Sequence, residues 1–149
     1  MSYDLKVERL IDATPEDVFD AFVGEDAMKE WYKLEPSWTT TVDAHDPTVG
    51  GTTSITFGGD ERYREDVAYT EIDRPNRVVY TETMQRLPEG NGSMVTTVMV
   101  TFQAQGNKTL VVLEQLGFED ATRRDAHQAG WPQFLARLDE VVTGRKEGR

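Results

Sequence analysis

The feature that most constrains the fold of this chain is a strongly apolar helical stripe near its C-terminus. Apolar residues recur there at intervals of three and four: Trp131, Phe134, Leu135, Leu138, Val141 and Val142. This spacing places all six side chains on one face of a helix that we expect to run from about Asp120 to Thr143. Nearly all the rest of the chain has the pattern of β-strands. One apolar helix in a mostly β chain must bury its face against the sheet, and a sheet that curls around it leaves room for a pocket.

The order of strand and helix signals predicts an α+β domain. An alternating strand at 4–11 precedes Thr14-Pro15-Glu16-Asp17, which is typical of a helix start because threonine caps, proline fits the first turn and acids suit the positive end. Gly24 is expected to end this helix, and a second short helix follows at 25–32. Further strands are predicted at 38–44, 52–57, 63–72, 77–86, 94–103 and 109–116. This order favours a curved antiparallel sheet of six to seven strands, with two short helices between the first two strands and the long helix on its face.

Length and charge narrow the class of protein. The 149 residues suit one domain spanning 1–149, with a frayed polar tail at 144–149. A net charge of −11 argues against partners such as nucleic acids or anionic membranes. The chain has no cysteine, its two histidines lie far apart, and we therefore expect no metal and no cofactor. Neither a signal peptide nor a membrane span is visible, so we expect a cytoplasmic location.

Short motifs along the chain resemble those of a known superfamily. In order they are RLIDATPEDVF at 9–19, Trp31, VGG at 49–51, EIDRPNRVVY at 71–80, VMVTF at 98–102, GF at 117–118 and HQAGW at 127–131. On these residues the chain resembles the helix-grip superfamily SRPBCC, which includes START lipid-transfer domains and the birch-pollen allergen fold. Within it, the chain is most similar to the branch named after homologues of the activator of the heat-shock-protein-90 ATPase. The resemblance implies a START-like, helix-grip fold, and the superfamily includes lipid carriers, hormone receptors, cyclases, hydrolases and stress-related co-chaperone domains.

A glutamate occupies the predicted inner face of the strand at 77–86. Tyr80, Glu82 and Met84 share that face, because alternate residues of a strand point to the same side. A lone ion in an apolar interior is costly, so three alternatives are open. Glu82 is neutral with a raised pKa, or it meets a hydrogen-bond donor or a cation such as Arg9 or Arg124, or it lies solvated at the rim of the sheet.

Two further polar residues are candidates for the pocket. His127 lies four residues before Trp131 and shares its helix face, where it could anchor a ligand, act as a base, or pack near the helix start. Gln115 lies among inward apolar neighbours and needs a partner, which could be a ligand, a water or another side chain. The predicted ligand-binding residues are Trp31, Phe57, Tyr69, Tyr80, Glu82, Met84, Gln115, His127, Trp131 and Phe134.

Pro132 interrupts the predicted helix directly after Trp131. Proline lacks a backbone donor and crowds the carbonyl four residues earlier. The helix is therefore expected either to kink near 128–131 or to begin there.

Three functional hypotheses follow. The first is a domain that binds a small, largely hydrophobic or amphipathic molecule between the sheet and the last helix, as a monomer or homodimer, rather than an enzyme. The second is a co-chaperone or stress-related domain that binds a chaperone or another protein. The third is a cyclase- or hydrolase-type enzyme that uses Glu82 or His127, although no triad arrangement of catalytic residues is visible.

Overall fold

The computed structural model of this chain describes residues 3–87 and 94–144. Within them it contains seven strands and three helices. The strands are β1 (Tyr3–Ile11), β2 (Thr39–His45), β3 (Thr52–Gly58), β4 (Arg62–Asp73), β5 (Arg77–Leu87), β6 (Met94–Gln105) and β7 (Lys108–Phe118). The helices are α1 (Pro15–Val23), α2 (Glu25–Trp31) and α3 (Ala121–Thr143). Every predicted strand and helix is confirmed, with ends shifted by one or two residues. Residues 88–92, between the strands predicted at 77–86 and 94–103, and the part of the predicted tail beyond Gly144 lie outside the described residues.

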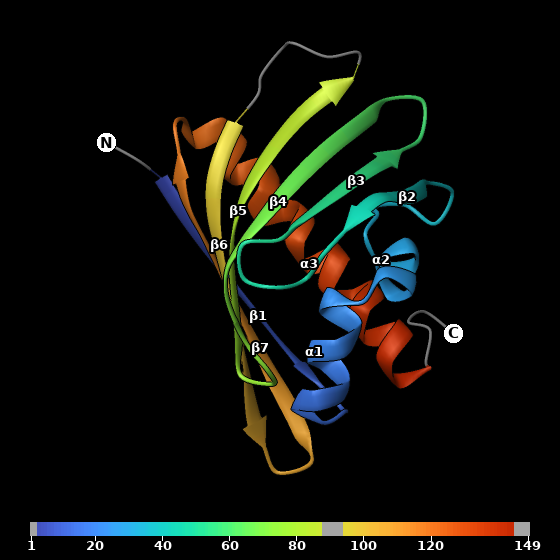
Figure 1. Ribbon diagram of the computed structural model, residues 1–149, viewed down its shortest axis with the longest axis vertical. Coiled ribbons are helices and arrows are strands. Elements are labelled where there is room, and N and C mark those ends of the chain that lie inside the picture. The colour runs from blue at the N-terminus through green and yellow to red at the C-terminus, as the bar shows by residue number, and fades with distance from the viewer. Residues whose placement is uncertain (1–2, 88–93, 145–149) are drawn as a thin grey trace.

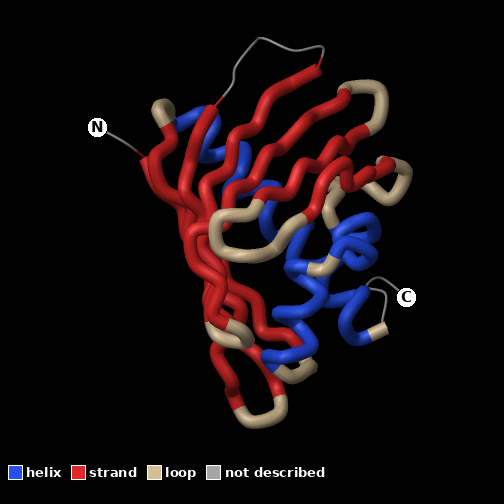
Figure 2. The backbone as a smooth tube through the Cα atoms, viewed as in Figure 1, coloured by secondary structure: helices blue, strands red, loops and turns tan. Residues whose placement is uncertain are grey.

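The seven strands form one antiparallel sheet in the order β1-β7-β6-β5-β4-β3-β2. The sheet curves around α3 (Figure 1), and the three helices lie on one side of it (Figure 2). β1 and β2 follow each other in the chain but form the opposite edges of the sheet, so α1 and α2 carry the chain from one edge to the other. This is the α+β architecture that the order of elements predicted.

The first helix, α1, and the last helix, α3, each begin at a capped position. The hydroxyl of Thr14 accepts a hydrogen bond from the backbone N–H of Asp17 at 3.3 Å, at the start of α1. At the start of α3, the carboxylate of Asp120 accepts one from the N–H of Arg123 at 2.8 Å. Each cap satisfies a backbone donor that has no partner inside the helix, which is worth about 1 kcal/mol.

Pro132 lies inside α3, eleven residues after the first residue of the helix. The expectation that the helix could begin near 128–131 is therefore wrong. The proline ring is exposed, on the side away from the sheet. Since proline has no N–H, the carbonyl of Gln128 lacks its usual partner within the helix.

The core lies between the concave face of the sheet and α3. Trp131, Phe134, Leu135 and Leu138 are all buried on the sheet-facing side of α3, and Val141 and Val142 are partly buried against the same core. Burying such a side chain contributes roughly 1.5–3 kcal/mol. The helical stripe of the sequence is thus the face that joins α3 to the sheet.

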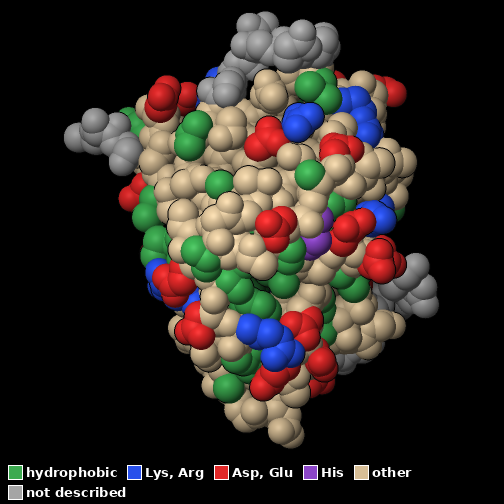
Figure 3. All heavy atoms as spheres, viewed as in Figure 1, with side chains coloured by type: hydrophobic (Ala, Val, Ile, Leu, Met, Phe, Trp, Pro, Cys, Tyr) green, Lys and Arg blue, Asp and Glu red, His purple; other side chains and the backbone are tan. Residues whose placement is uncertain are grey.

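The surface of the described residues carries many charged side chains. On the face shown in Figure 3, acidic and basic side chains are interspersed. Among the described residues, no helix combines the length and apolar character needed to cross a membrane.

Candidate ligand-binding cavity

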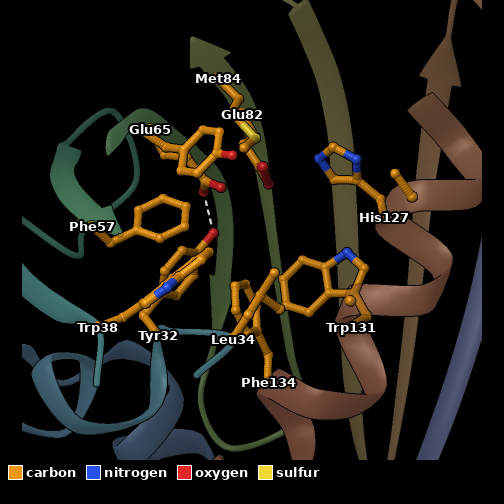
Figure 4. A pocket seen from close by; sticks show the side chains of 13 residues that line it. Tyr32, Leu34, Trp38, Phe57, Glu65, Glu82, Met84, His127, Trp131 and Phe134 are labelled. Carbon is orange, nitrogen blue, oxygen red and sulfur yellow. Dashed lines mark hydrogen bonds between the residues drawn. The ribbon is translucent and has the colours of Figure 1, made fainter. Parts of the chain in front are cut away.

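A partly open cavity of about 250 Å³ lies between the sheet and the first half of α3. Its walls come from β3, β4, β5, α3 and the segment that joins α2 to β2. The lining residues are Tyr32, Leu34, Trp38, Phe57, Tyr63, Glu65, Glu82, Met84, Ala126, His127, Gly130, Trp131 and Phe134. Figure 4 shows most of them as side chains that surround a common space. Six of the thirteen are aromatic rings other than histidine, so the cavity is mainly apolar.

Two carboxyl groups lie at the sheet side of this cavity. The β4–β5 register pairs Glu65 with Met84 and Val67 with Glu82, which makes the two glutamates diagonal neighbours on the inner face. Only 2% of Glu65 and 1% of Glu82 are exposed. The hydroxyl of Tyr32 donates a hydrogen bond to Oε2 of Glu65 (Figure 4). Two buried acids therefore share a small apolar space.

The burial of this pair changes the protonation of both groups. Burial raises the pKa of Glu65 to about 7, against the lowering effect of hydrogen bonds from Tyr32 and Glu82. Burial, the charge of Glu65 and the hydrogen bond between the two acids raise the pKa of Glu82 well above its usual range. At neutral pH, Glu82 therefore keeps its proton while Glu65 is partly ionised, and Glu82 is the donor in the hydrogen bond between them. Its other oxygen, Oε2, is buried without any hydrogen-bond partner.

These observations decide between the three alternatives for Glu82. The group is neutral with a raised pKa, and it does not lie solvated at the rim of the sheet. The two arginines considered as its partners lie elsewhere: Arg9 pairs with Asp139 at 2.9 Å, and Arg124 pairs with Asp125 at 2.7 Å. The neighbour that Glu82 does meet is a second acid, Glu65.

Gln115 finds its partners among other side chains. Its amide nitrogen donates to the hydroxyl of Thr96 at 2.7 Å, and its oxygen accepts from the indole nitrogen of Trp131 at 2.8 Å. All three residues are buried. The hydrogen bond holds the Trp131 ring in place as part of the cavity wall.

His127 lies at the edge of the cavity on α3. Its Nδ1 donates to the carbonyl oxygen of Arg123 at 3.0 Å, and its ring packs against Phe118 with 5.1 Å between ring centroids. Burial lowers the pKa of this imidazole, so the ring is neutral at neutral pH. His127 thus combines a packing role with a place on the cavity wall.

The structure brings together part of the predicted set. Phe57, Glu82, Met84, His127, Trp131 and Phe134 line the cavity. Three others, namely Trp31, Tyr69 and Tyr80, lie beyond Tyr32 around a separate void of only about 20 Å³. Gln115 does not line the cavity, but its oxygen accepts the hydrogen bond of the Trp131 indole, which does.

Seven lining residues were absent from the predicted set: Tyr32, Leu34, Trp38, Tyr63, Glu65, Ala126 and Gly130. Glu65 could have been found, because it alternates with the buried Val67 and Tyr69 on β4 in the same way as Glu82 on β5. The segment after α2 has no such period. Its position depends on Arg137 of α3, which donates to the carbonyl oxygens of Lys33 at 3.0 Å and Leu34 at 2.6 Å.

A wider groove continues outward from the cavity and shares Tyr63, Met84, Ala126 and His127 with it. Two arginines line this outer groove, and each already has an acidic partner. Arg86 pairs with Glu61, and Arg123 lies 3.8 Å from Asp120. The described part of the chain contains no group of three or more His, Asp or Glu side chains that could hold a metal ion.

A curved antiparallel sheet that grips a long C-terminal helix around an apolar cavity defines the helix-grip class of domains. Within this class, the chain belongs to the family described as Activator of Hsp90 ATPase homolog 1-like protein, whose sequence model matches residues 12–143. The resemblance noted in the sequence is thereby confirmed.

Solved structures with the same fold come from several bacteria. Protein CV1439 from Chromobacterium violaceum is 24% identical with a TM-score of 0.81, over 93% of this chain and 96% of that one. A protein from Arthrobacter aurescens is 18% identical with a TM-score of 0.82, over 95% and 87%. The AHSA1-like protein from Aeromonas hydrophila is 21% identical with a TM-score of 0.75, over 95% and 93%. At these identities the similarity establishes the fold. No curated protein sequence matches the chain significantly.

Proposed function

We propose that this domain binds a small, largely hydrophobic molecule in the cavity between the sheet and α3. The observation that carries the proposal is the cavity itself: about 250 Å³ of partly open space, lined by aromatic rings and ending at a buried polar group without a partner. A concave apolar site with few converging polar groups is the usual form of a small-molecule site. Empty space of this size in a core weakens packing, so a ligand that fills it stabilises the fold.

The test begins with native mass spectrometry of the gently purified protein, followed by extraction and identification of any bound molecule. Thermal unfolding in the presence of lipids, aromatic compounds and polyketide-like compounds then measures binding. A bound molecule or a reproducible rise in melting temperature supports the proposal. An empty protein that no compound stabilises contradicts it.

A matched pair of variants on α3 separates the cavity from the rest of the surface. Ala126 and Ala129 are both exposed, but only Ala126 lines the cavity. Ala126→Trp is expected to fill the cavity mouth and abolish binding, and Ala129→Trp is expected to leave binding unchanged. Equal binding by both variants would place the ligand elsewhere.

A catalytic use of the same site is a second candidate, favoured by the pKa of Glu65. A carboxyl group with a pKa of about 7 can both accept and donate a proton at neutral pH. Incubation of the bound molecule with the protein, followed by mass spectrometry, tests this candidate. Conversion that is lost in Glu65→Gln supports catalysis, and recovery of the molecule unchanged supports binding alone.

A protein-interaction role has less support from the described surface. Its most exposed large hydrophobic side chains are Leu10, Val49 and Val95, which come from β1, a loop and β6. Apolar residues scattered in this way are normal for a protein surface and do not form a docking patch.

A further inference from the structure

The buried acid pair has no cationic partner within the cavity. No lysine or arginine is among the lining residues in the described part of the chain. From α3, the only titratable group on the wall is His127, which is neutral, and from the loop after α2 it is Tyr32, a hydroxyl donor. The arginines of the outer groove are matched by Glu61 and Asp120. The negative charge that Glu65 and Glu82 share is therefore uncompensated where it lies.

The free oxygen of the pair lies beside the cavity. Figure 4 shows the Glu82 carboxyl between the β4 side of the cavity and His127 and Trp131 on α3. Oε2 of Glu82 has no hydrogen-bond partner, although an oxygen buried to this extent is normally paired. A ligand with a hydrogen-bond donor would satisfy this atom, and a positively charged donor would also offset the shared negative charge.

The rings around the acids suit the same kind of donor. Phe57 and Tyr63 lie 5.6 Å apart between centroids, and Trp38 lies 6.2 Å and 6.1 Å from them. Tyr32 packs against Phe57 at 5.1 Å. The faces of aromatic rings carry partial negative charge and attract organic cations, most strongly where water is excluded. Aromatic rings combined with an unmatched carboxyl pair form a site for an ammonium group attached to an apolar body.

From this arrangement we infer that the ligand is an organic amine, bound as a cation with its ammonium group at Glu65 and Glu82 and its apolar part against Trp131 and Phe134. This inference rests on the proposed function and narrows it to one chemical class. Binding of the cation favours the singly ionised form of the pair, so the fraction of Glu65 that is still protonated releases its proton to the solvent, while Glu82 keeps its own. An alcohol of the same shape binds without this release, and a carboxylate of the same shape is repelled.

The experiment compares matched probes by isothermal titration calorimetry at pH 7.5. One series is 2-phenylethylamine, 2-phenylethanol and phenylacetate, a second is tryptamine, tryptophol and indole-3-acetate, and a third is hexylamine, hexanol and hexanoate. In the series that fits the cavity, the amine is expected to bind at least about tenfold more tightly than the alcohol, as a charge-assisted hydrogen bond provides. Titrations in two buffers of different ionisation enthalpy are expected to show proton release with the amine and none with the alcohol.

The variants test whether the acid pair causes the preference for the amine over the alcohol. Glu65→Gln removes the ionised carboxyl, so it is expected to lose about tenfold in affinity for the amine and to leave the affinity for the alcohol unchanged. Glu82→Gln replaces the neutral member of the pair by a neutral amide and is expected to keep most of the preference for the amine. Glu114→Gln is the matched control, because Glu114 lies on β7 next to Gln115 and outside the cavity lining.

The outcomes are distinct. A preference for amines that is lost in Glu65→Gln and kept in Glu114→Gln supports the inference. Alcohols that bind as tightly as amines in every series overturn it and leave the proposed binding function standing. A protein that binds no member of any series overturns the inference and also counts against the proposed function.

Discussion

The buried acid pair predicts that one conservative substitution stabilises the protein in a pH-dependent way. In Glu65→Gln, the amide oxygen still accepts from the Tyr32 hydroxyl, but the side chain no longer ionises. The folded pKa of Glu65 is about 7 against an ordinary value of 4.5, so the folded state binds this proton more tightly than the unfolded state. The carboxyl therefore lowers stability as pH rises through that interval.

The magnitude follows from the same two values. A shift from 4.5 to about 7, at about 1.4 kcal/mol per pKa unit, amounts to about 3 kcal/mol. This cost is absent below pH 4.5, grows between pH 4.5 and 7 and is complete above pH 7. The charge of Glu65 also raises the pKa of Glu82. Its removal therefore lowers that pKa toward the ordinary value, and this second effect on stability has the same sign. We expect Glu65→Gln to match the wild type at pH 4 and to exceed its free energy of unfolding by about 3 kcal/mol at pH 8.

The assay is urea unfolding of both proteins at intervals between pH 4 and pH 8. Contributions of ionisable groups other than Glu65 and Glu82 cancel in the difference between the two curves. Glu114→Gln removes the same formal charge from a position outside the cavity and controls for net charge. A difference between wild type and Glu65→Gln that stays constant from pH 4 to pH 8 would refute the argument that ionisation of this carboxyl opposes folding.

Three further predictions concern α3. Trp131→Phe leaves the buried oxygen of Gln115 unpaired and should cost about 1–3 kcal/mol in urea unfolding, and an unchanged midpoint would mean that the hydrogen bond contributes nothing. Burial lowers the pKa of His127, so the NMR titration of this imidazole should have a midpoint below 6.5. The lowered pKa should have no effect on the free energy of unfolding above pH 6.5 and should decrease it as the pH falls below that value. A midpoint above 6.5 contradicts this. Pro132→Ala gives the Gln128 carbonyl a partner and should raise stability by up to about 3 kcal/mol, whereas a lower melting temperature would indicate that the proline shape is needed.

The fold could be predicted from the sequence because local signals and global packing agree. The stripe on α3, the Thr14 cap and the alternation on β5 each require a particular element, and the structure contains all of them. The face of Glu82 was predictable for the same reason, since its strand neighbours on that side are apolar. Periodicity tells which side a residue faces.

The membership of the cavity was less predictable, because it depends on contacts between distant segments. Glu65 is not in the predicted set although β4 has the same alternation as β5, and its carboxyl, rather than a cation, is the neighbour of Glu82. Trp31 and Tyr80 have the size and the inward direction of lining residues, yet they lie beyond Tyr32, around the smaller void. The position of Tyr32 itself follows from the irregular segment that Arg137 holds, and no periodic pattern reports it.

The strand order has a consequence for how the chain reaches this structure. Strands β2 to β7 each pair with a neighbour in sequence, so they can assemble by successive hairpins. β1 is the exception, because its partner is β7, and Ile11 pairs with Thr109. Closing such a long loop costs entropy before any contact is gained, so this pairing is expected to form late and to limit the folding rate. Until β7 is in place, β1 therefore has no strand to pair with.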